Sequence, residues 1–77
     1  MDLNEFVANF ADQIDDVDAD TIKADTEFKD LDEWSSMSAL AVIAMVDAEY
    51  DVQIKGDDIR NAETIEDLFN RVKEIKG

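Results

Sequence analysis

Apolar residues recur at intervals of three and four along most of this 77-residue chain, a spacing that favours helices over strands. In the first segment the apolar positions are Leu3, Phe6, Val7, Phe10 and Ile14, and acidic or polar residues fill the positions between them. This pattern predicts an amphipathic helix over residues 2–14. The chain contains no proline, and its two glycines are Gly56 and Gly77.

A second helix is predicted over residues 36–50, where apolar side chains cover most of the helix surface. Charge appears only near its end, at Asp47 and Glu49. A helix that is apolar on most sides usually lies in the centre of a domain. We therefore expect Leu40 to be part of the core, where its replacement by alanine costs about 2–5 kcal/mol.

Two further helices are predicted in the last third of the chain. Either Asp57 or Asp58 can cap a short helix that reaches Asn61. Thr64 and Asp67 have nearly the spacing and composition of a capping box, and apolar residues keep helical spacing from there to the end. The preceding segment, residues 51–56, alternates in polarity, but its two apolar residues are too few to predict a strand.

Residues 15–34 form a long connection in which aspartate is frequent, and aspartate favours turns and caps over helix interiors. Its scattered apolar residues are expected to fix the loop to the core: Val17, Ile22, Phe28, Leu31 and Trp34. The predicted fold is a single all-α domain over residues 1–77. It is an antiparallel four-helix bundle, with three main helices, one short helix and a long first loop.

The chain is strongly acidic, with 21 Asp and Glu against 7 Lys and Arg and a net charge of −14. Such a domain repels nucleic acids and anionic membranes and attracts basic protein surfaces. No apolar stretch approaches the roughly 20 residues of a membrane helix, and the first residues do not resemble a signal peptide. We expect a cytoplasmic monomer whose partners are proteins, with no nucleic-acid or membrane partner.

The composition also restricts the chemistry, because the chain has neither histidine nor cysteine. Imidazole catalysis, thiolate chemistry and the usual zinc sites are thereby excluded. The aspartates between Asp15 and Asp20 lack the glycine and the distal glutamate of a calcium-binding EF-hand loop. The sequence therefore predicts no catalytic residue and no metal site.

The residues from Glu33 to Ser38, Glu-Trp-Ser-Ser-Met-Ser, place hydroxyl groups where the second helix begins. Either Ser35 or Ser36 suits the N-cap position, where a hydroxyl accepts a backbone N–H. No base at an obvious spacing could activate Ser36 as a nucleophile. A functional role for Ser36 would be passive: a serine at a helix N-terminus is exposed, and the helix dipole favours an attached phosphodiester.

Several segments together resemble the acyl carrier protein family over nearly the whole chain. They are Phe28-Lys29-Asp30-Leu31, Trp34-Ser35-Ser36-Met37, the apolar helix ending in Glu49-Tyr50, Asp57-Asp58-Ile59, and Ala62 to Leu68. Counting back from Tyr50 places the family's modified serine on Ser36. The resemblance implies that Ser36 carries covalent 4′-phosphopantetheine and that the protein is a carrier, not an enzyme.

The resemblance also implies partners and cargo. The cargo would be acyl intermediates held as thioesters, for fatty acid, polyketide or related biosynthesis. The partners would be a phosphopantetheinyl transferase and acyl-processing enzymes with basic docking surfaces. The residues expected to dock them flank Ser36 and close its helix: Asp30, Asp32, Glu33, Met37, Asp47, Glu49 and Asp51.

The motif departs from the family at two positions: Ser35 stands in place of an aspartate and Met37 in place of a leucine. The aspartate would place a carboxylate beside the loaded serine. Its absence supports an alternative function, an unmodified acidic interaction or regulatory module with the carrier fold.

Overall fold

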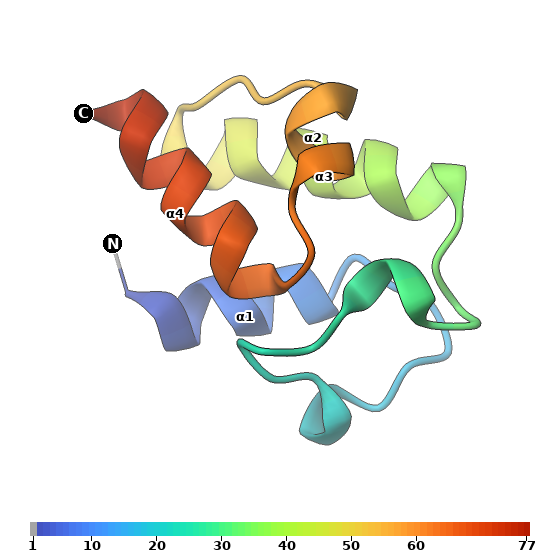
Figure 1. The fold of residues 1–77 in the computed structure, drawn as a ribbon. Coiled ribbons are helices and arrows are strands. Elements are labelled where there is room, and N and C mark those ends of the chain that lie inside the picture. The colour runs from blue at the N-terminus through green and yellow to red at the C-terminus, as the bar shows by residue number, and fades with distance from the viewer. Residues whose placement is uncertain (1) are drawn as a thin grey trace.

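The computed structural model describes residues 2–77, and in that part of the chain every regular element is helical. The main elements are α1 (Leu3–Ala11), α2 (Ser36–Tyr50), the short α3 (Gly56–Asn61) and α4 (Ile65–Lys76). α1 packs against α2 and α4, and α3 packs between α2 and α4. α2 runs back across α1, and a long loop joins the two at one end of the bundle (Figure 1). The predicted all-α class and four-helix arrangement are confirmed.

The limits of α2 agree with the prediction, but α1 is shorter than predicted and ends at Ala11. Asp12 caps its C-terminus, and the N–H groups of Gln13 and Ile14 then bond to the carbonyls three residues back, at 3.0 and 3.1 Å, which forms tight turns in place of α-helical bonds. Ile14 is nevertheless buried. The apolar spacing therefore identified a core residue correctly, although that residue lies in a turn outside the helix.

Side chains cap the starts of α1, α3 and α4, as well as that of α2, which is described with the functional site. Asp2 accepts a hydrogen bond from the N–H of Asn4 at the start of α1. Thr64 and Asp67 form the predicted reciprocal capping box of α4, with N···O distances of 3.2 and 3.1 Å. At α3 the capping carboxylate belongs to Asp58, which accepts the N–H of Lys55 at 2.9 Å.

The hydrogen bonds of Asp58 should make the stability of the fold depend measurably on pH. The hydrogen bond from the Lys55 N–H and one from Arg71 Nε at 2.9 Å hold the pKa of Asp58 below its ordinary 3.8. A carboxylate whose pKa is depressed in the folded state stabilises the fold at pH values above its ordinary pKa. This stabilisation is lost as the pH falls through the folded-state pKa.

Asp58→Asn should therefore lower the free energy of unfolding at pH 7 by about 1 kcal/mol, because a charge-assisted hydrogen bond becomes a neutral one. Urea denaturation at pH 7 and at several values below 4 should show the wild type and variant converging in acid. A difference that stays constant across that range would show that the Asp58 charge adds nothing to stability.

The core is built from side chains of all four helices and the loop. Those without accessible surface are Phe6, Phe10, Phe28, Val42, Val46, Ile65, Leu68 and Val72. Aromatic contacts run through it, with Phe6 touching Phe69 at 5.4 Å and Phe10 touching Phe28 at 5.0 Å between ring centroids. The short α3 contributes Ile59 to the same cluster.

Residues 12–35 connect α1 to α2 and contain two single turns of 3-10 helix, η1 (Ala19–Thr21) and η2 (Phe28–Asp30). Ile22 and Phe28 are buried, and Val17, Leu31 and Trp34 pack against the core, as predicted. Two loop carbonyls, of Ala24 and Thr26, accept the N–H groups of Glu66 and Ile65. The loop is therefore held in place by the N-terminus of α4, whose first N–H groups have no partner within the helix.

The prediction that Leu40 belongs to the core is wrong. α2 buries Ser38, Val42, Met45 and Val46, and the side of the helix that bears Leu40 faces solvent. Leu40 is 66% exposed and Met37 is 79% exposed. An apolar pattern on nearly all sides of a helix does not indicate which stripe packs inward, so the pattern could not distinguish Leu40 from its buried neighbours.

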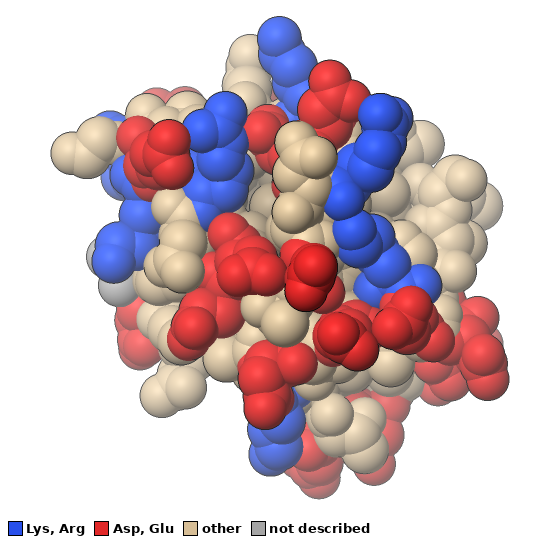
Figure 2. All heavy atoms as spheres, viewed as in Figure 1, with Lys and Arg blue, Asp and Glu red and all other residues tan. Residues whose placement is uncertain are grey.

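Charge is distributed unequally along the chain. Residues 1–54 hold 15 of the 21 acidic residues but only two of the seven basic ones. In Figure 2 most basic side chains lie in the upper part of the view, and carboxylates cover the middle and lower part. Residues 1–54, which include α1, the first loop and α2, therefore carry nearly all of the excess negative charge.

Self-repulsion in this acidic part predicts that added salt stabilises the protein. Salt shortens the screening length to roughly 8–10 Å at ordinary ionic strength, which weakens repulsion between exposed carboxylates. The melting temperature should rise from low to physiological salt, and divalent cations should raise it further. Thermal unfolding followed by circular dichroism tests this; an unchanged midpoint would show that the fold already compensates these charges.

Candidate functional site

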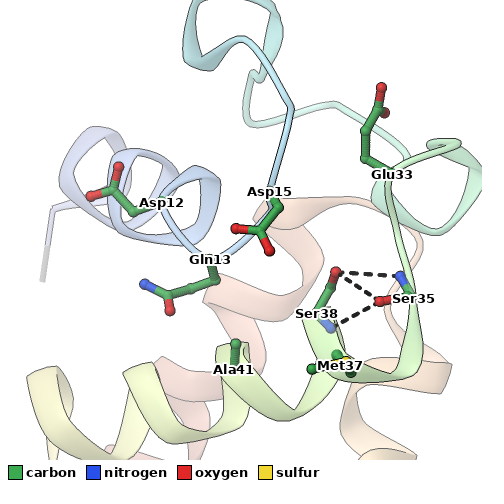
Figure 3. Close-up of a pocket in the computed structure, with 8 residues that line it drawn as sticks. All are labelled: Asp12, Gln13, Asp15, Glu33, Ser35, Met37, Ser38 and Ala41. Carbon is green, nitrogen blue, oxygen red and sulfur yellow. Dashed lines mark hydrogen bonds between the residues drawn. The ribbon is translucent and has the colours of Figure 1, made fainter.

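The start of α2 is fixed by a pair of serines on either side of Ser36. Ser35 is the N-cap, in extended conformation, and its Oγ accepts the N–H of Ser38 at 3.3 Å. In return Ser38 Oγ accepts the N–H of Ser35 at 3.3 Å, and the two hydroxyls lie 3.3 Å apart (Figure 3). Of the two serines that could have capped the helix, Ser35 does so.

Ser36 is the first residue of α2, and its side chain is exposed. Among the described residues nothing forms a hydrogen bond with its hydroxyl, whereas the neighbouring hydroxyls bond to each other. Ser38 is only 6% exposed, so its hydroxyl is not accessible to another protein. Ser36 is therefore the one of the three serines whose hydroxyl is both accessible and not engaged in capping.

The segment that leads into Ser36 is anchored by Trp34. Its indole stacks on Phe10, with centroids 5.8 Å apart and an interplanar angle of 6°, and meets Phe28 edge-on at 4.9 Å. The N–H of Trp34 also bonds to the carbonyl of Leu31 at 3.1 Å. These contacts fix the chain two residues before Ser36, so the serine projects from a defined position.

An open hollow lies beside this helix start, between the end of α1 and the first turns of α2 (Figure 3). Asp12, Gln13 and Asp15 line one side of it, and Glu33 lies above on the loop. The lining from α2 is Ser35, Met37, Ser38 and Ala41. Three carboxylates from two separate chain segments therefore surround one hollow next to Ser36.

The structure separates the predicted docking residues into two groups. Glu33 and Met37 line the hollow, and the exposed Asp30 and Asp32 lie on the loop that leads to it. Asp47, Glu49 and Asp51 lie at the opposite end of α2. At a rise of 1.5 Å per residue, about 16 Å of helix separates Ser36 from Asp47. The sequence did not indicate that Asp12 and Asp15 lie beside Glu33 in this first group. No local pattern shows where the long loop between them returns to the bundle.

The described residues offer no catalytic apparatus at this site. None of them bonds to the Ser36 hydroxyl, so the described part of the chain places no base within hydrogen-bond reach of it. In residues 2–77 no group of three or more carboxylates is placed to hold a metal ion. Nor is any helix of that part long and apolar enough to cross a membrane.

The site fits a group attached through a phosphodiester. Ser36 Oγ is accessible, and the N–H groups of Ser36 and Met37 have no acceptor in the described part of the chain. N–H groups at a helix start favour a negative charge placed close to them. Ser36 would hold such a group covalently, and these two N–H groups would orient its phosphate.

A family model described as "Phosphopantetheine attachment site" matches residues 5–72 of the chain. This match runs from Glu5 in α1 to Val72 in α4 and includes the first loop, α2 and α3. No solved structure matched the chain.

Proposed function

This chain belongs to the family of phosphopantetheine-attachment domains, and we propose that Ser36 is the residue that carries the group. Domains of this family are carriers and not catalysts, and they hold 4′-phosphopantetheine covalently. When bound, this group supplies the terminal thiol on which acyl groups are held as thioesters. The chain itself contains no thiol, because it has no cysteine.

The observation that carries the assignment is that the three serine hydroxyls differ in hydrogen bonding and exposure. Ser35 and Ser38 satisfy each other and the helix start, which leaves the exposed hydroxyl of Ser36 free for a bond to the prosthetic group. The capping pair and the anchored Trp34 hold this position without help from Ser36. The chain can therefore lose the Ser36 hydroxyl, or modify it, with little effect on the fold.

The acidic hollow influences how an attached group is presented. Asp15 and Glu33 line it together with Ser35 and Met37, the two neighbours of Ser36, and their charges repel a phosphodiester. This repulsion opposes burial of the group against the protein surface and favours its extension into solvent, where a visiting enzyme can reach it. The base for attachment to Ser36, and every later reaction, must come from such an enzyme.

We place the cargo in acyl metabolism, in fatty acid, polyketide or related biosynthesis. The competing function is an acidic interaction module that is never modified, which Ser35 in place of the family aspartate would favour. The intact mass of the purified chain, measured before and after incubation with a broad-specificity phosphopantetheinyl transferase and coenzyme A, separates the two. A carrier gains the mass of one phosphopantetheinyl group, and an unmodified module gains none.

A further inference from the structure

The hydroxyl groups of Ser35 and Ser38 form a hydrogen bond with each other, and burial decides which of them donates. Their Oγ atoms lie 3.3 Å apart, and each also accepts the backbone N–H of the other residue. Ser38 is only 6% exposed, and among the described residues its O–H has no acceptor other than Ser35 Oγ. Because a buried hydroxyl without a partner costs free energy, Ser38 donates and Ser35 accepts.

The O–H of Ser35 is therefore directed away from the pair. A serine oxygen has two lone pairs and one proton, and Ser35 Oγ uses both lone pairs for the N–H and the O–H of Ser38. Ser35 is exposed and lines the acidic hollow (Figure 3). The described part of the chain gives its proton no acceptor, so this proton is available to a group attached at the next residue.

The charges around the hollow favour a neutral donor at this position. Asp12, Asp15 and Glu33 line the hollow, and no lysine or arginine of the described residues does. A carboxylate in place of Ser35 would add a further negative charge beside a phosphodiester on Ser36, and it could only accept hydrogen bonds. Ser35 caps α2 without that charge and keeps a proton to donate.

On the basis of the proposed function, we infer that Ser35 binds the phosphate on Ser36, by donating its hydroxyl proton to a phosphodiester oxygen. Ser38 supports this role, because its buried O–H fills the second acceptor site of Ser35 Oγ and so directs the Ser35 proton outward. Ser35 would hold the phosphate end of the attached group, while the rest of the group extends from the acidic hollow. The serine that replaces the family aspartate then suits a loaded carrier with an acidic surface.

Different substitutions separate the two roles of Ser35, the cap and the donated hydrogen bond. Alanine removes both. Aspartate keeps the cap, because its carboxylate accepts the N–H of Ser38, but it cannot donate to a phosphate and repels it. Threonine keeps the hydroxyl and with it both roles. A lost cap weakens the loaded and the unloaded protein alike, so the change in stability on loading reports the donated bond.

The experiment measures the melting temperature of each variant before and after treatment with a phosphopantetheinyl transferase and coenzyme A, with complete loading checked by intact mass. Compared with the wild type, the change in melting temperature on loading should be less favourable by about 4 °C or more in Ser35→Ala. It should be less favourable still in Ser35→Asp, where added salt should recover part of the loss. Ser35→Thr should retain the wild-type change.

The matched control is Thr64→Ala, which removes a reciprocal cap of the same kind from the start of α4. It should lower the melting temperature equally with and without the attached group. A second measurement needs only the wild type: the phosphorus NMR signal of the loaded protein should differ between the folded state and the state unfolded in urea.

Three results would overturn the inference. One is a change on loading in Ser35→Ala or Ser35→Asp equal to that of the wild type, because Ser35 would then be a cap alone. Another is a loss in Ser35→Thr as large as in Ser35→Ala, and the third is an identical phosphorus signal in the folded and unfolded wild type. If the wild type is never loaded, the proposed function fails and the inference fails with it. A loaded wild type with any of the three results removes the inference alone.

Discussion

Replacing Phe10 by alanine is expected to lower the free energy of unfolding by about 3–5 kcal/mol. Phe10 has no accessible surface and contacts Phe6, Phe28 and Trp34, so it joins α1 to the loop that precedes Ser36. A domain of this size has a total stability of only about 4–12 kcal/mol. Urea denaturation followed by circular dichroism should therefore find the unfolding midpoint of the variant at a much lower urea concentration than that of the wild type.

The control for Phe10→Ala is Leu40→Ala, which removes an apolar side chain of comparable kind from the exposed face of α2. Because Leu40 lies mostly in water, its loss should change stability by no more than about 0.5 kcal/mol. Equal destabilisation by the two substitutions would show that α2 is rotated about its axis relative to the structure described here.

Replacing Ser36 by alanine should abolish loading with phosphopantetheine. The acceptor oxygen is then absent, and the neighbouring hydroxyls are engaged in the cap or buried. Ser35→Ala should still be loaded, although loss of its cap costs about 1 kcal/mol of stability. The measurement is the intact mass of each variant after incubation with the transferase and coenzyme A.

Thermal unfolding supplies the control for this pair of variants. Ser36→Ala should melt within a few degrees of the wild type, because its hydroxyl makes no hydrogen bond within the described residues, whereas Ser35→Ala should melt lower. Loading that persists in Ser36→Ala and disappears in Ser35→Ala would shift the attachment site by one residue. Loss of loading together with unfolding in Ser36→Ala would instead reveal a structural role for this hydroxyl.

Much of the fold follows from local patterns in the sequence. The limits of α2 and the capping box of Thr64 and Asp67 depend on neighbouring residues, so apolar spacing and cap chemistry are sufficient to predict them. The end of α1 was predicted less well, because Ile14 keeps the helical spacing although it lies in a turn that follows the helix. The local pattern shows that Ile14 is buried, but not that the helix has already ended.

The surroundings of Ser36 depend on long-range packing and were only partly predictable. Ser36 was predicted as the attachment residue from the family resemblance, by counting back from Tyr50, and this assignment stays a prediction. Asp12 and Asp15 reach the same hollow as Glu33 because a loop of more than twenty residues returns to the bundle, and no local pattern encodes where it returns. Leu40 was misassigned because α2 carries apolar residues on its exposed side as well as its buried one.

The central claim is that Ser36 carries 4′-phosphopantetheine, and locating the group on the loaded wild-type chain tests it most directly. The protein would be incubated with transferase and coenzyme A, digested, and sequenced by tandem mass spectrometry. The account predicts one modified peptide, with fragment ions that place the added mass on Ser36. Fragment ions that place it on Ser35 or Ser38, or a chain that stays unmodified under conditions that load a known carrier, would contradict it.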